Sequence, residues 1–205
     1  MITMTKVKIC GLSRLEDIDA VNYAMPDFIG FVFAPSQRKV DTKQAAKLKE
    51  KLDLRIEAVG VFVNEEIENI AAIYKAGTIN LVQLHGDEDD EYIKRLRAAC
   101  GCQIIKSISI NNIFPALPTE SDYLLFDAFS DQRGGAGKTF NWNLLKDYSG
   151  LPYFLAGGLS LENVNDALHI LAPFCLDVSS GIETGGVKDA GKIEEFVSLI
   201  REHQS

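Results

Sequence analysis

Two residues of this sequence combine a reactive side chain with an apolar setting. Cys10 ends the run Val-Lys-Ile-Cys-Gly, and Asp127 lies within Leu-Leu-Phe-Asp-Ala-Phe. A thiol with a lowered pKa can act as a base or nucleophile, and apolar neighbours disfavour the ionised form of a carboxyl group, which suits a general acid. Each residue also has an ordinary explanation, because small thiols are common in cores and a carboxylate can cap a loop. Cys10 and Asp127 are therefore candidates for acid–base chemistry.

The elements that must position these groups alternate between short apolar runs and amphipathic segments, as in repeated βα units. Eight strands are predicted at Lys6–Cys10, Phe28–Phe33, Glu57–Val63, Leu81–His85, Gln103–Ile110, Tyr123–Phe129, Pro152–Ala156 and Cys175–Val178. Helices are predicted at 14–24, 42–52, 65–76, 88–99, 141–148, 161–172 and 191–203.

This alternation predicts an α/β fold, a compact single-domain (β/α)8 barrel. The segment Asn111–Ser121 contains Pro115 and Pro118, so the fifth helix should be short or irregular. A doubly wound sheet is the competing fold, but it would need a glycine-rich fingerprint after the first strand, and Cys10-Gly11-Leu12 does not supply one. The barrel is the preferred interpretation.

Active sites of such barrels lie at the carboxyl ends of the strands, which selects a further set of polar residues. The candidates are Arg38 after the second strand, Gln83 and His85 on the fourth, and Asp177 on the eighth. Glycine-bearing turns follow the last two strands, where exposed backbone N–H groups often hold phosphate, although a tight turn is the alternative for either one alone. The phosphate candidates are Gly157, Gly158, Ser180 and Gly181.

The loop 130–139 carries three glycines together with Arg133 and Lys138. It lacks the residue order of a nucleotide-binding P-loop. We interpret it as a mobile lid beside Asp127, with a flexible surface loop as the alternative.

Composition predicts one folded domain over residues 1–205. The chain is 46% hydrophobic and 24% charged, which allows a sizeable core without disulfides or metals, and its four cysteines should be free thiols. A formal net charge of -8 with no basic run argues against nucleic-acid binding.

No apolar run approaches the roughly 20 residues that span a bilayer, and the N-terminus lacks the pattern of a signal peptide, so we expect a cytoplasmic protein that does not bind membranes. Monomer and homodimer both remain open.

Several segments form an ordered set from the first strand to the eighth. They are Lys8-Ile9-Cys10-Gly11 with Glu16-Asp17, Gly30-Phe31-Val32-Phe33 with Ser36-Gln37-Arg38, Val59-Gly60-Val61-Phe62-Val63-Asn64, Val82-Gln83-Leu84-His85-Gly86, Gly134-Gly135-Ala136-Gly137-Lys138-Thr139-Phe140, Leu155-Ala156-Gly157-Gly158-Leu159 with Asn163-Val164, and Asp177-Val178-Ser179-Ser180-Gly181-Ile182-Glu183 with Gly186-Val187-Lys188-Asp189. With this set the chain resembles the phosphoribosylanthranilate isomerase family of tryptophan biosynthesis. Asn141 and Gln37 depart from the family pattern, in loops rather than at a proposed catalytic group.

The resemblance implies an Amadori rearrangement of a small phosphorylated substrate, N-(5-phosphoribosyl)anthranilate, with no cofactor and no metal. Cys10 would be the general base and Asp127 the general acid. Arg38 would bind the anthranilate carboxylate through its planar fork, and Asp177 would meet a sugar hydroxyl. Gln83 and His85 are further substrate-binding candidates, and the glycine turns would hold the phosphate.

Other phosphosugar barrels are the enzymatic rivals. A ribulose-phosphate epimerase would be expected to supply metal-binding His and Asp at strand ends, where His85 is the only histidine. An indoleglycerol-phosphate synthase would be expected to use a strand-end lysine as its acid, for which Lys106 is the only apparent candidate. A silent phosphometabolite-binding module is the rival from another class, and the presence of both Cys10 and Asp127 argues against it.

Strand alternation places Lys8 on the same face as Cys10, and therefore inside the barrel. A buried ammonium needs a carboxylate partner, and barrel closure brings the eighth strand beside the first. Asp177 is the only acid in the eighth strand, so we expect a Lys8–Asp177 contact. The alternative is a strand shifted by one residue, with Lys8 in solvent.

Overall fold

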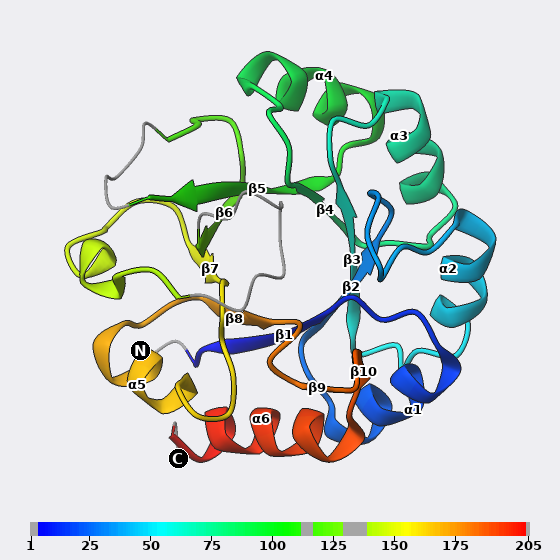
Figure 1. Cartoon of the computed structure of the whole chain (residues 1–205). Coiled ribbons are helices and arrows are strands. Elements are labelled where there is room, and N and C mark those ends of the chain that lie inside the picture. The colour runs from blue at the N-terminus through cyan, green and yellow to red at the C-terminus, as the bar shows by residue number, and fades with distance from the viewer. Residues whose placement is uncertain (1–3, 112–116, 129–138, 204–205) are drawn as a thin grey trace.

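The computed structural model describes residues 4–111, 117–128 and 139–203. Within these ranges parallel strands close into a barrel in chain order, with the last strand paired to the first (Figure 1). The strands are β1 (Lys6–Cys10), β2 (Phe28–Val32), β3 (Glu57–Phe62), β4 (Leu81–Leu84), β5 (Gln103–Ile110), β6 (Tyr123–Ala128), β7 (Tyr153–Leu155) and β8 (Cys175–Val178). The predicted (β/α)8 barrel is confirmed, and the predicted strand ends differ by one residue at several positions.

The helices lie around the outside of the barrel (Figure 1). They are α1 (Leu15–Ala24), α2 (Thr42–Lys49), α3 (Ile67–Lys75), α4 (Asp90–Cys100), α5 (Val164–Ile170) and α6 (Ala190–His203). Between β5 and β6 the described residues 117–122 contain no helix. None of the helices in the described part of the chain is long and apolar enough to cross a membrane.

The helix predicted at 141–148 is instead a single 3-10 turn, η1 (Trp142–Leu145). The Asn141 side chain accepts a hydrogen bond from the Asn143 backbone N–H at 3.2 Å and begins the turn. Only Trp142 and Leu145 of the turn are buried, and a spacing of three residues places them on one edge of a 3-10 helix. Among the described residues between β6 and β7, a single short turn therefore stands where a helix was predicted.

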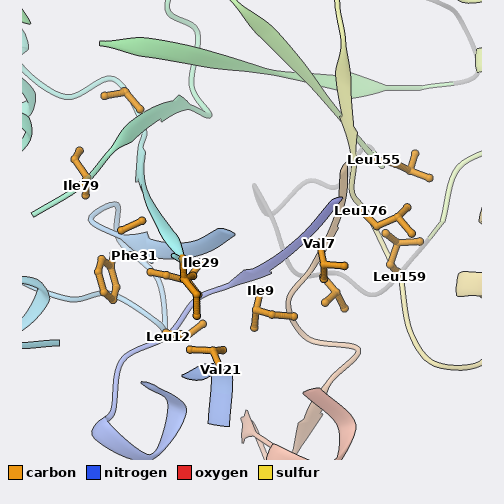
Figure 2. Packing of buried hydrophobic residues seen from close by; sticks show 14 of the residues in the cluster. Val7, Ile9, Leu12, Val21, Ile29, Phe31, Ile79, Leu155, Leu159 and Leu176 are labelled. Atoms are coloured by element: carbon orange, nitrogen blue, oxygen red, sulfur yellow. The ribbon is translucent and has the colours of Figure 1, made fainter. Parts of the chain in front are cut away.

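Alternation along the strands divides the apolar residues into an outer and an inner core. Val7 and Ile9 of β1 belong to the outer core, where Ile9 lies toward Leu12 and Val21 and Val7 lies toward Leu159 and Leu176 (Figure 2). The inner core fills the barrel and consists of Phe28, Val59, Leu81, Ile105, Leu125, Phe154, Ala156 and Cys175. Because successive side chains point to opposite faces, Lys8 and Cys10 face inward with this second set.

The amino-terminal end of the barrel interior is closed by aromatic rings. The ring centroids of Phe28 and Phe154 lie 5.6 Å apart, and those of Tyr123 and Phe174 lie 5.1 Å apart. The Lys6 Nζ stands 5.0 Å from the Phe28 centroid, in cation–π geometry. Apart from Lys6, this end of the interior is thus filled by aromatic rings, and the strand positions nearer the carboxyl ends are left for the polar side chains.

Candidate active site

The two predicted acid–base residues lie at the carboxyl ends of their strands, and both side chains face the barrel interior. Cys10 is the last residue of β1, and Asp127 is the penultimate residue of β6. Four strands lie between β1 and β6 in one direction around the closed barrel and two in the other. The two side chains can therefore address one molecule from different sides of the barrel mouth.

Lys8 and Asp177 form a buried ion pair. Their Cα atoms are register partners on β1 and β8, and the Lys8 Nζ lies 2.7 Å from the Asp177 Oδ2. Lys8 has no exposed surface. Burial acts to lower the pKa of Lys8, but the Asp177 carboxylate outweighs it and holds that pKa above its ordinary value. The predicted contact and the inward register of β1 are both confirmed.

Gln83 of β4 connects the Lys8–Asp177 pair to His85. The Lys8 Nζ also donates to the Gln83 Oε1 at 2.9 Å, and the Gln83 Nε2 lies 3.0 Å from the His85 Nδ1. The His85 Nε2 in turn lies 3.5 Å from the Asp127 Oδ2. Both ends of the buried Gln83 amide contact protein groups, which favours a positioning role for Gln83 over direct substrate contact.

The Cys10 thiol occupies space that a glycine leaves open. Gly30 is its register partner on β2, and a Cβ atom on Gly30 would stand 2.6 Å from the Cys10 Sγ. Burial raises the pKa of the Cys10 thiol, whereas the positive charges of Lys8 and Lys188 oppose that increase. The thiol is thus less readily ionised than an ordinary cysteine, its thiolate is the stronger base once formed, and the two lysines limit the increase in pKa.

Glu183 holds Arg38 at the carboxyl end of the barrel. The Arg38 Nε and Nη2 donate to the two Glu183 carboxylate oxygens at 2.7 and 2.9 Å. The Lys188 Nζ donates to the same carboxylate at 2.7 Å. These contacts keep the pKa of Glu183 below its ordinary value, although burial alone would raise it.

A small hairpin after β8 aligns Glu183 with Lys188. Its strands are β9 (Glu183–Thr184) and β10 (Val187–Lys188), and the two charged residues are direct register partners. Gly185 and Gly186 between them have φ values of 61° and 80°. Positive φ at both central residues is the geometry of a tight type I′ turn, which glycine adopts without strain.

The predicted phosphate residues lie in two adjoining loops. Gly157 and Gly158 follow β7 with φ values of 84° and 66°, and Gly157 lies against Asp127. Gly181 follows β8 and pairs with Ser160 of the first loop. The structure thus brings the two loops that carry Gly157, Gly158, Ser180 and Gly181 together at the barrel mouth, and Gly157 lies against Asp127.

Comparison with known proteins identifies the relatives of this barrel. A family model described as N-(5'phosphoribosyl)anthranilate (PRA) isomerase matches residues 7–199. The chain belongs to the N-(5'-phosphoribosyl)anthranilate isomerase family. An N-(5'-phosphoribosyl)anthranilate isomerase of Endomicrobium trichonymphae is 47% identical over 199 residues, which cover 97% of this chain and 99% of the relative.

Solved isomerases of this family share the whole fold. The phosphoribosyl anthranilate isomerase of Thermotoga maritima superposes with a TM-score of 0.85 at 34% identity, covering 97% of this chain and all of the other. A second solved isomerase, in complex with reduced 1-(o-carboxyphenylamino)-1-deoxyribulose 5-phosphate, has a TM-score of 0.80 at 30% identity, again covering 97% and 100% of the two chains. The resemblance to this isomerase family and its barrel fold is confirmed.

Glu183, Lys188 and Ser107 also lie at this candidate site, and the sequence pattern predicted no role for them. The Ser107 Oγ lies 3.5 Å from the His85 Nε2, and the Lys188 Nζ donates to the Ser179 carbonyl at 2.8 Å. Glu183 is the only acidic side chain between Asp177 and Asp189. Because Arg38 needs an anionic partner, this position could have been predicted as that partner. The proposed lid, 130–139, lies almost wholly outside the described residues.

Proposed function

We propose that this chain catalyses the Amadori rearrangement of N-(5-phosphoribosyl)anthranilate to 1-(2-carboxyphenylamino)-1-deoxyribulose 5-phosphate. Family membership supports the reaction, and one observation about this chain carries the residue assignment. Cys10 and Asp127 reach the same barrel mouth from β1 and β6, so a single substrate can contact both.

In this mechanism Asp127 is the general acid and Cys10 the general base. Asp127 protonates the furanose ring oxygen, and the ring opens to a Schiff base. The Cys10 thiolate then removes the proton from sugar C2, which gives an enolamine. Return of a proton to C1 and loss of the C2 hydroxyl proton complete the isomerisation without net gain or loss of atoms. The positive charges of Lys8 and Lys188 favour the thiolate that this step requires.

Arg38 binds the anthranilate carboxylate through the edge of its guanidinium group that Glu183 leaves free. Glu183 takes the edge formed by Nε and Nη2. A guanidinium has five N–H donors, so the edge formed by Nη1 and the second Nη2 hydrogen can still donate two parallel hydrogen bonds to a carboxylate. Glu183 then fixes the plane of the fork before the substrate arrives.

The loops after β7 and β8 bind the phosphate, and Asp177 binds a sugar hydroxyl. Two consecutive residues with positive φ, Gly157 and Gly158, turn the chain so that backbone N–H groups can converge on an anion. The Asp177 Oδ1 is buried and has no hydrogen-bond partner within the described part of the chain. A buried acceptor of this kind gains from a hydroxyl donor supplied by the ligand.

We also infer that the protein acts in the cytoplasm. Its proposed substrate carries a phosphate and a carboxylate, and such charges are costly to move into a bilayer. The enzyme should therefore work in the compartment where this substrate is made.

A coupled fluorescence assay that follows loss of phosphoribosylanthranilate tests the function. Cys10→Ala and Asp127→Ala should each lower kcat by about 10² or more, the range for loss of a general acid or base. Cys100→Ala, at the end of α4, is the matched thiol control and should keep normal turnover. Absence of turnover by the wild-type protein would refute the proposed reaction, and near-normal kcat in either active-site variant would remove that residue from the mechanism.

A further inference from the structure

A continuous row of polar contacts crosses the barrel interior from β1 to β6. It passes from Lys8 to Gln83 at 2.9 Å, from Gln83 to His85 at 3.0 Å, and from His85 to Asp127 at 3.5 Å. Lys8 has no exposed surface and Gln83 is 2% exposed. The side chains of His85 and Asp127 are only 18% and 14% exposed, at the barrel mouth. Solvent therefore has little access to the first two members.

The chemistry of lysine fixes the orientation of the Gln83 amide. An ammonium group has three donors and no acceptor, so the Gln83 atom that faces Lys8 must be the carbonyl oxygen. The amide NH2 group then faces the His85 Nδ1, because the two ends of a planar amide cannot exchange independently. Lys8 in this way determines that the His85 Nδ1 faces the NH2 group of Gln83.

The amide orientation in turn fixes the tautomer of His85. The Gln83 Nε2 is a donor, so the His85 Nδ1 must be an acceptor without a proton. A neutral imidazole then carries its proton on Nε2, the atom that faces the Asp127 Oδ2 and the Ser107 Oγ. An imidazolium would place an Nδ1–H against the Gln83 N–H at 3.0 Å, two donors facing one another.

This protonation state matters for a general acid. An imidazolium beside Asp127 would stabilise the carboxylate and so remove the proton that Asp127 must deliver. A neutral Nε2–H does not supply that charge, yet it still donates to the carboxylate that remains after proton transfer. Hydrogen bonds in unliganded active sites are commonly long, so the 3.5 Å contact has room to shorten when the substrate binds.

The other charged groups around His85 are few in the described part of the chain. Asp127 faces it from β6, and Asp177 contributes charge from β8 while it is paired with Lys8 of β1. Ser107 of β5 is uncharged. The Lys106–Glu88 ion pair involves the register partner of Leu84, which places it on the outer side of β4 and β5.

We propose that Lys8 and Gln83 are positioning residues that hold His85 as a neutral imidazole with its proton on Nε2, directed at the general acid Asp127. The proposal rests on the proposed function in assigning the acid role to Asp127. The tautomer of His85 itself does not depend on that assignment.

Nitrogen NMR of the imidazole ring tests the tautomer directly. The chain has three histidines, and His169→Gln with His203→Gln leaves His85 as the only one. Those two histidines contact one another on α5 and α6, away from the barrel mouth, and their replacement should leave turnover unchanged. In this background we expect an unprotonated Nδ1 and a protonated Nε2 throughout the pH range of constant kcat. A protonated Nδ1 would overturn the proposal without any activity measurement.

Two substitutions of Gln83 test the consequence for turnover. Gln83→Glu is nearly isosteric, but its carboxylate only accepts, so the His85 Nδ1 should take up a proton and kcat should fall about tenfold or more, with KM changed less than about threefold. Gln83→Met fills the same space without a polar group, so it should loosen the tautomer preference and lower kcat less than Gln83→Glu does.

Thermal unfolding of both variants provides the fold control. If Gln83→Glu is folded and keeps the wild-type tautomer, or changes the tautomer while kcat is unaltered, Lys8 and Gln83 do not act through His85. If both variants fail to fold, the wild-type tautomer still decides the proposal. Absence of wild-type turnover, by contrast, would contradict the proposed reaction and would leave the NMR result standing on its own.

Discussion

Replacing Lys8 with methionine should destabilise the protein far more than a surface substitution does. Methionine has a similar length and fills the same space, but it donates no hydrogen bond. The change leaves the Asp177 carboxylate buried without its cation and the Gln83 carbonyl without the donor now 2.9 Å away. Both losses occur where Lys8 has no contact with solvent.

The expected size of the effect follows from these two losses. Removing one partner of a buried ion pair costs about 3–5 kcal/mol, and an unsatisfied buried acceptor costs about 1–3 kcal/mol. Asp177 can take up a proton, which limits the first cost. We therefore expect the free energy of unfolding to fall by about 3 kcal/mol or more. For a chain of this size that corresponds to a decrease in Tm of about 6–12 °C.

Urea unfolding followed by the fluorescence of the single tryptophan, Trp142, and by circular dichroism gives the measurement. Lys47→Met, at an exposed position of α2, is the matched control and should change stability by less than about 0.5 kcal/mol. Asp177→Asn added to Lys8→Met should restore part of the loss, because it removes the unpaired charge. A loss below about 0.5 kcal/mol for Lys8→Met itself would refute the role of the buried pair.

Two further predictions concern Cys10. Lys188→Met should move the ascending limb of the pH profile of kcat/KM to higher pH, because the positive charge of Lys188 lowers the pKa of the thiol; an unmoved limb would mean that this charge does not reach Cys10. Gly30→Ala should lower kcat by about tenfold or more, because the new Cβ would stand 2.6 Å from the Cys10 Sγ and displace it, a scale of error that commonly costs about 10² in rate. Gly191→Ala, in α6 with only an ordinary contact at 3.4 Å, is its control, and equal activity of the two variants would contradict the packing argument.

The sequence by itself determined the barrel, most of its strands and the inward direction of Lys8 and Cys10. These features depend on local patterns, since apolar runs specify buried parallel strands and a period of two assigns each side chain to a face. The Lys8–Asp177 pair was predictable for the same reason, because closure makes β8 the neighbour of β1. The prediction of a helix at 141–148 was wrong, because composition alone does not show how few of these side chains the fold buries.

Only the tertiary structure decided which polar groups meet across strands that are not neighbours. The Arg38–Glu183 pair joins residues 145 positions apart, and its geometry depends on a hairpin set by Gly185 and Gly186. Gln83 stays a predicted substrate ligand, because strand position shows only that its side chain faces inward. Whether it meets a ligand or a protein partner depends on the depth of each inward residue, and packing of the complete barrel sets that depth.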